Sequence, residues 1–83
     1  MNKIFITLTL IICIKAHSQT ASDYYTLGNN KYLLKDYKEA VKDYTKAIEL
    51  KPNFSKAYYS RALVENIQKE YKDALKDLSK VIE

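Results

Sequence analysis

A chain of 83 residues is long enough for one small domain and too short for two. Apolar residues make up 47% of it and charged residues 29%, with one glycine and one proline, which excludes a flexible linker and suits amphipathic helices. Lys3 and Lys15 precede all acidic residues, so 12 basic and 10 acidic residues follow residue 18. The resulting charge of +2 argues against a nucleic acid as partner.

Residues 1–18 have the order of a secretory signal peptide. Lys3 lies in a short basic start, residues 4–14 are almost wholly apolar, and Ala16 and Ser18 supply small residues where a signal peptidase reads the chain. We expect cleavage after Ser18 and a periplasmic or secreted protein. No stable membrane insertion is expected after cleavage, because the apolar run has about half of the roughly 20 residues that a membrane-spanning helix needs.

Two other interpretations of this segment remain open. Residues 4–14 could be retained as a short anchor or a buried helix, or Cys13 could carry a lipid, since Leu10 to Cys13 resembles a lipobox. Lipidation is disfavoured because the residue before the cysteine, Ile12, is not small. Cys13 and His17 are the only cysteine and histidine, so cleavage would remove both.

Apolar residues at steps of three and four predict four helices, over 22–34, 37–50, 55–68 and 71–83. The expected face of the first helix consists of Tyr24, Leu27, Gly28, Lys31 and Leu34. We expect the buried faces of the second and fourth helices to consist of Tyr37, Ala40, Val41, Tyr44, Ala47 and Ile48, and of Tyr71, Ala74, Leu75, Leu78, Val81 and Ile82.

Local signals mark where these helices begin and end. Asp36 is expected to cap the second helix, with Glu39 completing a D-x-x-E capping box. Pro52 ends that helix, because proline lacks a backbone donor and disfavours helix in the residue before it. Ser55 can start the third. Gly28 costs about 1 kcal/mol against alanine inside a helix, so we expect it to face Ala40 at a close helix approach.

The chain contains an internal repeat. The segment 21–49 aligns without gaps on the segment 55–83 and shares 11 identities in 29 positions, including Tyr24 and Tyr25 on Tyr58 and Tyr59. A period of about 34 residues is typical of helical repeat proteins.

These residues resemble the tetratricopeptide repeat, whose consensus positions are supplied here by Tyr24, Leu27, Gly28, Tyr37, Ala40, Ala47 and Pro52. The resemblance implies an all-α fold, in which two antiparallel helix-turn-helix units form a short right-handed α-solenoid. The first repeat would occupy 21–54 and the second 55–83, within a domain over 19–83. The second repeat is incomplete and has no C-terminal cap. Lys31 and Glu65 depart from the usual aromatic residue, and Arg61 from the usual leucine.

The resemblance also implies a binding face, because the first helix of each unit lines a concave surface that binds peptides. The family positions that bind a partner fall here on Tyr25, Asn29, Tyr32, Leu33, Lys56, Tyr59, Leu63 and Asn66. Tyr25 and Tyr59 lie outside the predicted core stripe, which makes them the first candidates. For Tyr32 and Leu33, packing between repeats is an equally good interpretation. Tyr25 stands where a carboxylate clamp needs lysine, which argues against that kind of binding.

Catalysis finds no support in the sequence. The segment after residue 18 has no histidine or cysteine, so no catalytic triad or metal cluster of those residues and no cofactor site is expected. Acidic residues precede lysines by three positions at 39/42, 43/46, 73/76 and 77/80, which predicts solvated outer helix faces. There nothing should shift the pKa of the carboxylates.

The expected function is therefore a non-enzymatic scaffold that binds a peptide or protein partner on the concave face. The alternative is the N-terminal fragment of a longer array, with a mainly structural role and its specificity beyond residue 83. Repeat arrays usually need about three units. Self-association through the uncapped C-terminal helix is a further expectation.

Overall fold

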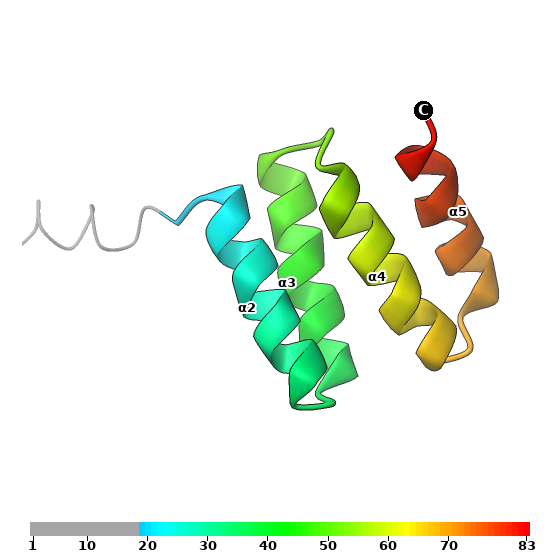
Figure 1. Ribbon diagram of the computed structural model, residues 1–83, viewed down its shortest axis with the longest axis horizontal. Coiled ribbons are helices and arrows are strands. Elements are labelled where there is room, and N and C mark those ends of the chain that lie inside the picture. Colours follow the sequence, from blue (N-terminus) through cyan, green and yellow to red (C-terminus); the bar gives the residue numbers. More distant parts are fainter. Residues whose placement is uncertain (1–18) are drawn as a thin grey trace, which may run out of the picture.

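The computed structural model describes residues 19–83, which form four α-helices (Figure 1). They are α2 (Ala21–Leu33), α3 (Tyr37–Leu50), α4 (Ser55–Ile67) and α5 (Tyr71–Val81). These bounds lie within two residues of the predicted ranges, and the predicted all-α class is confirmed. The proposed signal peptide, with Cys13 and His17, lies outside the described residues.

The helices form two helix-turn-helix units, unit 1 with α2 and α3 and unit 2 with α4 and α5. Within each unit the two helices run antiparallel, and α3 packs against α4 to join the units side by side (Figure 1). This stacking of similar hairpins is the start of an α-solenoid. None of the helices in residues 19–83 is long and apolar enough to cross a membrane.

In both units, the same kind of tight turn joins the two helices. Lys35 and Lys69 take left-handed backbone conformations, with φ of 62° and 64°. In unit 1, Lys35 N–H donates to the Tyr32 carbonyl and Asp36 N–H to the Lys31 carbonyl, both at 2.9 Å. This is the Schellman arrangement, which satisfies carbonyls left free at the end of a helix.

The capping box expected at Asp36 is absent. Asp36 is the residue before α3, but its side chain makes no cap hydrogen bond, because ψ is 74° where the Thr20 cap has an extended 168°. The capping box lies instead at the start of α2, where Asp23 N–H donates to Thr20 Oγ1 at 3.1 Å and Thr20 N–H to Asp23 Oδ2 at 3.0 Å. Ser55 begins α4 as expected, without capping it.

The core lies between the two units and is centred on Tyr44. Ala40, Tyr44 and Val64 are fully buried, with Tyr25, Tyr37 and Val41 packed around them. The predicted inner face of α3 is confirmed. A Cβ atom at Gly28 would lie 2.6 Å from two carbon atoms of the Tyr44 ring. Gly28 therefore makes room for Tyr44, and the nearest neighbour is not Ala40 as expected.

The predicted buried face of α5 is only partly buried. Ala74 is buried and Val81 half-buried, but Tyr71, Leu75, Leu78 and Ile82 are exposed. Their positions in unit 1 are Tyr37, Val41, Tyr44 and Ile48, which are buried or half-buried at the junction with α4. The prediction was wrong for α5 because, within residues 19–83, no helix packs on that side of unit 2.

Candidate functional site

A small hollow of about 80 Å³ lies where α2, α3 and α4 meet. It is lined by Asn29, Tyr32, Tyr44, Ser60 and Leu63. Further exposed apolar side chains lie on the same two helices: Leu33 follows Tyr32 on α2, and Tyr59 and Ile67 lie four residues before and after Leu63 on α4. We call this surface, hollow included, the α2–α4 face.

A short hydrogen bond sets the polar chemistry of the hollow. The Tyr44 hydroxyl donates to Asn29 Oδ1 at 2.6 Å. Burial, followed by the neighbouring Tyr25, raises the pKa of Tyr44 to about 12, so the hydroxyl keeps its proton at neutral pH. Because the amide oxygen of Asn29 is held by Tyr44, its Nδ2 group has the two donors that remain for another partner.

Tyr25 belongs to the core as much as to the surface. Its ring centre lies 5.2 Å from that of Phe54 and 5.9 Å from that of Tyr44, and its hydroxyl accepts a hydrogen bond from Ser60 Oγ at 3.4 Å. The expectation that Tyr25 lies outside the core was wrong, because the chain between α3 and α4 brings Phe54 over its ring. Its principal contacts join unit 1 to unit 2.

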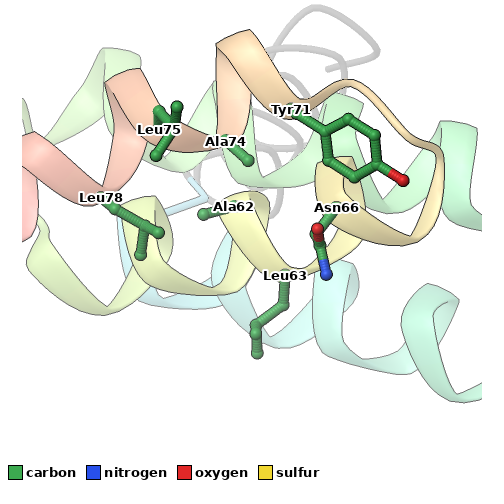
Figure 2. A pocket seen from close by; sticks show the side chains of 7 residues that line it. All are labelled: Ala62, Leu63, Asn66, Tyr71, Ala74, Leu75 and Leu78. Carbon is green, nitrogen blue, oxygen red and sulfur yellow. The ribbon is translucent and has the colours of Figure 1, made fainter.

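The other candidate residues are spread unevenly. Asn29, Tyr32 and Leu63 meet around the hollow, whereas Asn66 lines a groove between α4 and α5, which Leu63 also lines (Figure 2). Leu33 is 75% exposed and Tyr59 is 50% exposed on the same α2–α4 face, and Lys56 is exposed near the start of α4. The structure thus brings three of the eight candidates together around one hollow.

Sequence reasoning missed two residues of the hollow. Tyr44 was assigned to the core, but the space above Gly28 lets its hydroxyl reach Asn29. Ser60 has no apolar or charged signal, and its place follows from the packing of α4 on Tyr25. The only signal in the sequence that points to Tyr44 is Gly28, the residue before Asn29, because a glycine there leaves room for a tyrosine on the facing helix.

A second polar cluster ties α3, α4 and α5 together around Arg61. Its guanidinium donates through Nε and Nη2 to the two oxygens of Asp77, both at 2.7 Å, and through Nη1 to Thr45 Oγ1 at 3.0 Å. Asp77 is 4% exposed and Glu65 8% exposed. Glu65 Oε2 lies 3.8 Å from Arg61 Nε, while Glu65 Oε1 is buried without a hydrogen-bond partner.

The pKa values of the two carboxyl groups in this cluster are shifted in opposite directions. Burial raises the pKa of Glu65 to about 8, assisted by the neighbouring carboxylate of Asp77. Burial also acts to raise the pKa of Asp77, but the hydrogen bond from Arg61 outweighs it and the pKa falls. The expectation that carboxylates occur only on solvated faces, with Asp77 beside Lys80, was therefore wrong. The expected ion pair between Glu39 and Lys42 is present at 3.8 Å.

We regard the Arg61 cluster as structural. The two shortest hydrogen bonds of Arg61 both go to Asp77, within unit 2. A buried bidentate pair of this kind fixes one arrangement of α4 on α5. Within residues 19–83, no group of histidine, cysteine, aspartate and glutamate side chains is arranged to hold a metal ion.

Comparison with known proteins agrees with this architecture. The family model of the tetratricopeptide repeat matches residues 21–54, which cover α2, α3 and the connection to α4. No curated protein matches the chain. Residues 21–54 thus resemble a tetratricopeptide repeat both in sequence and in their helix-turn-helix structure. Repeats of this family are typically non-catalytic units for protein–protein interaction.

Proposed function

We propose that this chain is a protein-interaction scaffold of an exported protein, periplasmic or secreted, that binds a peptide segment on the α2–α4 face. The observation that supports this most is the juxtaposition of exposed apolar side chains with a fixed amide. Leu63, which lines the hollow, is 40% exposed, and Tyr59, about one helical turn before it on α4, is 50% exposed. Tyrosine is favoured at interfaces because it offers a large ring and a polar tip at low entropic cost.

An extended peptide has the chemistry that this face needs. Its backbone carbonyls require donors, and Asn29 has the two hydrogens of Nδ2 left after Tyr44 has taken its oxygen. Its apolar side chains can pack on Tyr32, Tyr59 and Leu63 on either side of the hollow. Recognition would therefore combine one backbone contact with apolar pockets.

The direct test is binding of peptides selected from a library of short random peptides by the full chain. Tyr59→Ala is expected to weaken the selected peptides by at least about tenfold, the usual loss at an interface anchor. Tyr71→Ala is the matched control, because Tyr71 is similarly exposed (56% against 50%) but lies on α5. Equal affinity of both variants for the peptides, measured by calorimetry, would move the site away from the α2–α4 face.

A second substitution tests the role of the amide. Asn29→Asp keeps an oxygen that accepts from Tyr44 and removes the two Nδ2 donors, so helicity should persist while peptide binding weakens. Asn30→Asp is its control, since Asn30 lies on the exposed side of the same helix. If both variants bind peptides as the unchanged chain does, the amide has no part in recognition.

Export is supported by the pattern of residues 1–18 alone, with its basic start, apolar run and small residues at 16 and 18. The chain, expressed with this segment in a bacterium, should be recovered from the periplasm or medium with Gln19 at its N-terminus. Mass spectrometry of the recovered protein decides this. A chain that keeps Met1 and stays in the cytoplasm would contradict export and leave the binding proposal untouched.

A further inference from the structure

Glu65 occupies a buried position in which an ionised carboxylate finds little support. The residue is 8% exposed, and within residues 19–83 its Oε1 atom has no hydrogen-bond partner. Its Oε2 atom lies 3.8 Å from Arg61 Nε, which is too far for a hydrogen bond, and that N–H donates to Asp77 Oδ2 at 2.7 Å. Because an ionised carboxylate can only accept hydrogen bonds, burying it without a donor is costly.

The charges around Glu65 favour a proton on its carboxyl group. On α5, the buried Asp77 and the exposed Asp73 both act on Glu65 with negative charge. On α4, Arg61 supplies a positive charge, but Asp77 takes it in a bidentate pair. The α3 helix contributes Thr45, which is uncharged, through its bond to Arg61. A proton on Glu65 therefore balances the buried charges, in agreement with its pKa of about 8.

A polar hollow of about 370 Å³ adjoins this cluster and is lined in part by Glu65 itself. Besides Glu65, Arg61 and Asp77, its lining consists of Tyr58, Asp73, Lys76 and Lys80. The ammonium group of Lys80 lies 3.6 Å from Glu83 Oε1, but no ion pair within residues 19–83 includes Lys76. The hollow therefore offers room for a carboxylate group and a cation to receive it.

We propose that Glu65 is a pH-sensitive switch with two positions. The protonated side chain stays buried beside Asp77, and the ionised side chain turns into the hollow towards Lys76. Rotation about the bonds of the side chain is sufficient, because Glu65 already lines the hollow. The outward turn leaves a space beside Asp77, so the packing of α5 on α4 loosens as pH rises. This switch does not depend on the proposed peptide binding.

A pH titration of the full chain, followed by the carbon-13 resonance of the Glu65 carboxyl group, tests the buried position. Glu65→Gln removes this resonance and so identifies it. The midpoint of the titration should lie at about 8, as the pKa of the buried group requires. A midpoint below about 7 would show that the buried group is ionised at neutral pH, which overturns the proposal.

Lys76→Gln tests the outward position. In the buried position the pKa of Glu65 responds to Asp77, Arg61 and Asp73, so a response to Lys76 reports the outward one. The midpoint should rise by at least about 0.5 pH unit, because the ionised form loses its cation. Lys72→Gln is the matched control, since Lys72 is exposed on the same helix but does not line the hollow. Equal midpoints in the two variants would overturn the outward turn.

Hydrogen exchange of the α5 amides tests the loosening. At pH 9 these amides should exchange faster in the unchanged chain than in Glu65→Gln, whose neutral side chain stays in place. At pH 6 the two proteins should exchange alike. Comparison at one pH removes the intrinsic effect of pH on exchange, so equal rates at pH 9 would show that ionised Glu65 does not loosen the packing and would overturn the switch.

Discussion

Units 1 and 2 share one backbone design but differ in the side chains that hold their helices together. Unit 1 packs a tyrosine over a glycine, Tyr44 over Gly28, and unit 2 has Leu78 and Ala62 at the same places. Leu27 and Lys31 of unit 1 correspond to Arg61 and Glu65 of unit 2, while the aspartate at 43 and 77 is unchanged. The comparison shows that residues in contact differ between the units in matched sets. A larger side chain is accompanied by a smaller partner, and a cation by an anion.

The largest effect is expected from removing the cation of unit 2. Arg61→Leu, which restores the unit 1 residue, should cost about 3 kcal/mol in the free energy of unfolding, because it leaves Asp77 buried without its partner. Adding Glu65→Lys completes the unit 1 set and should recover much of this loss. Urea unfolding followed by circular dichroism measures both. If the single and double variants are equally unstable, the residues do not act as a set.

The packed pair of unit 1 is tested by Gly28→Ala. The added Cβ meets the Tyr44 ring at 2.6 Å, so we expect a loss of about 2 kcal/mol in the free energy of unfolding, as for other overpacked cores. Tyr44→Leu in the same chain recreates the alanine–leucine pair of unit 2 and should relieve the clash. A double-mutant cycle by urea unfolding measures the coupling, and additive effects would contradict the matched pair.

Glu65 of unit 2 should add a pH dependence to the stability of the whole chain, because its pKa is raised to about 8 from an ordinary value of 4.5. The folded chain thus binds a proton that the unfolded chain has lost, so stability should fall as pH rises from about 4.5 to about 8 and then level off. Glu65→Gln cannot titrate and should lack this part of the pH dependence. Urea midpoints at pH 5.5 and 8.5 should differ more in the unchanged chain than in this variant.

The smallest effect should be the same in both units. Lys35→Gly and Lys69→Gly relieve left-handed backbone conformations and should each stabilise the chain by about 1 kcal/mol. Thermal unfolding of each variant measures the gain. A gain at one turn alone would show that the two turns, alike in backbone, differ in energy.

Helix positions could be predicted well because they depend on signals along the chain. The internal repeat, the apolar spacing and Pro52 fix the four helices to within two residues. The cap at Asp36 could not be predicted from its residue type, because the preceding turn sets its ψ at 74°. Local sequence does not report how a neighbouring turn constrains a cap.

The candidate site could be predicted only for residues whose exposure follows from their position in the repeat. Asn29, Tyr32 and Leu63 lie around the hollow as expected, whereas Tyr25 is held by Phe54, from the connection between α3 and α4. Arg61 and Glu65 have the composition of a surface helix, and their burial depends on Asp77 from the next helix. Contacts between helices decide how deeply these residues are buried. The apolar periodicity of a single helix carries no information about such contacts.

The guanidinium group of Arg61 has a consequence for how the molecule unfolds. Arg61 stands on α4 and holds Asp77 of α5 together with Thr45 of α3. Opening the hairpin of unit 2 breaks the pair between Arg61 and Asp77, and it leaves the charge of Arg61 beside Thr45 of unit 1 without its partner. Melting of residues 19–83 should therefore be a single cooperative transition, with no state in which one repeat survives the other.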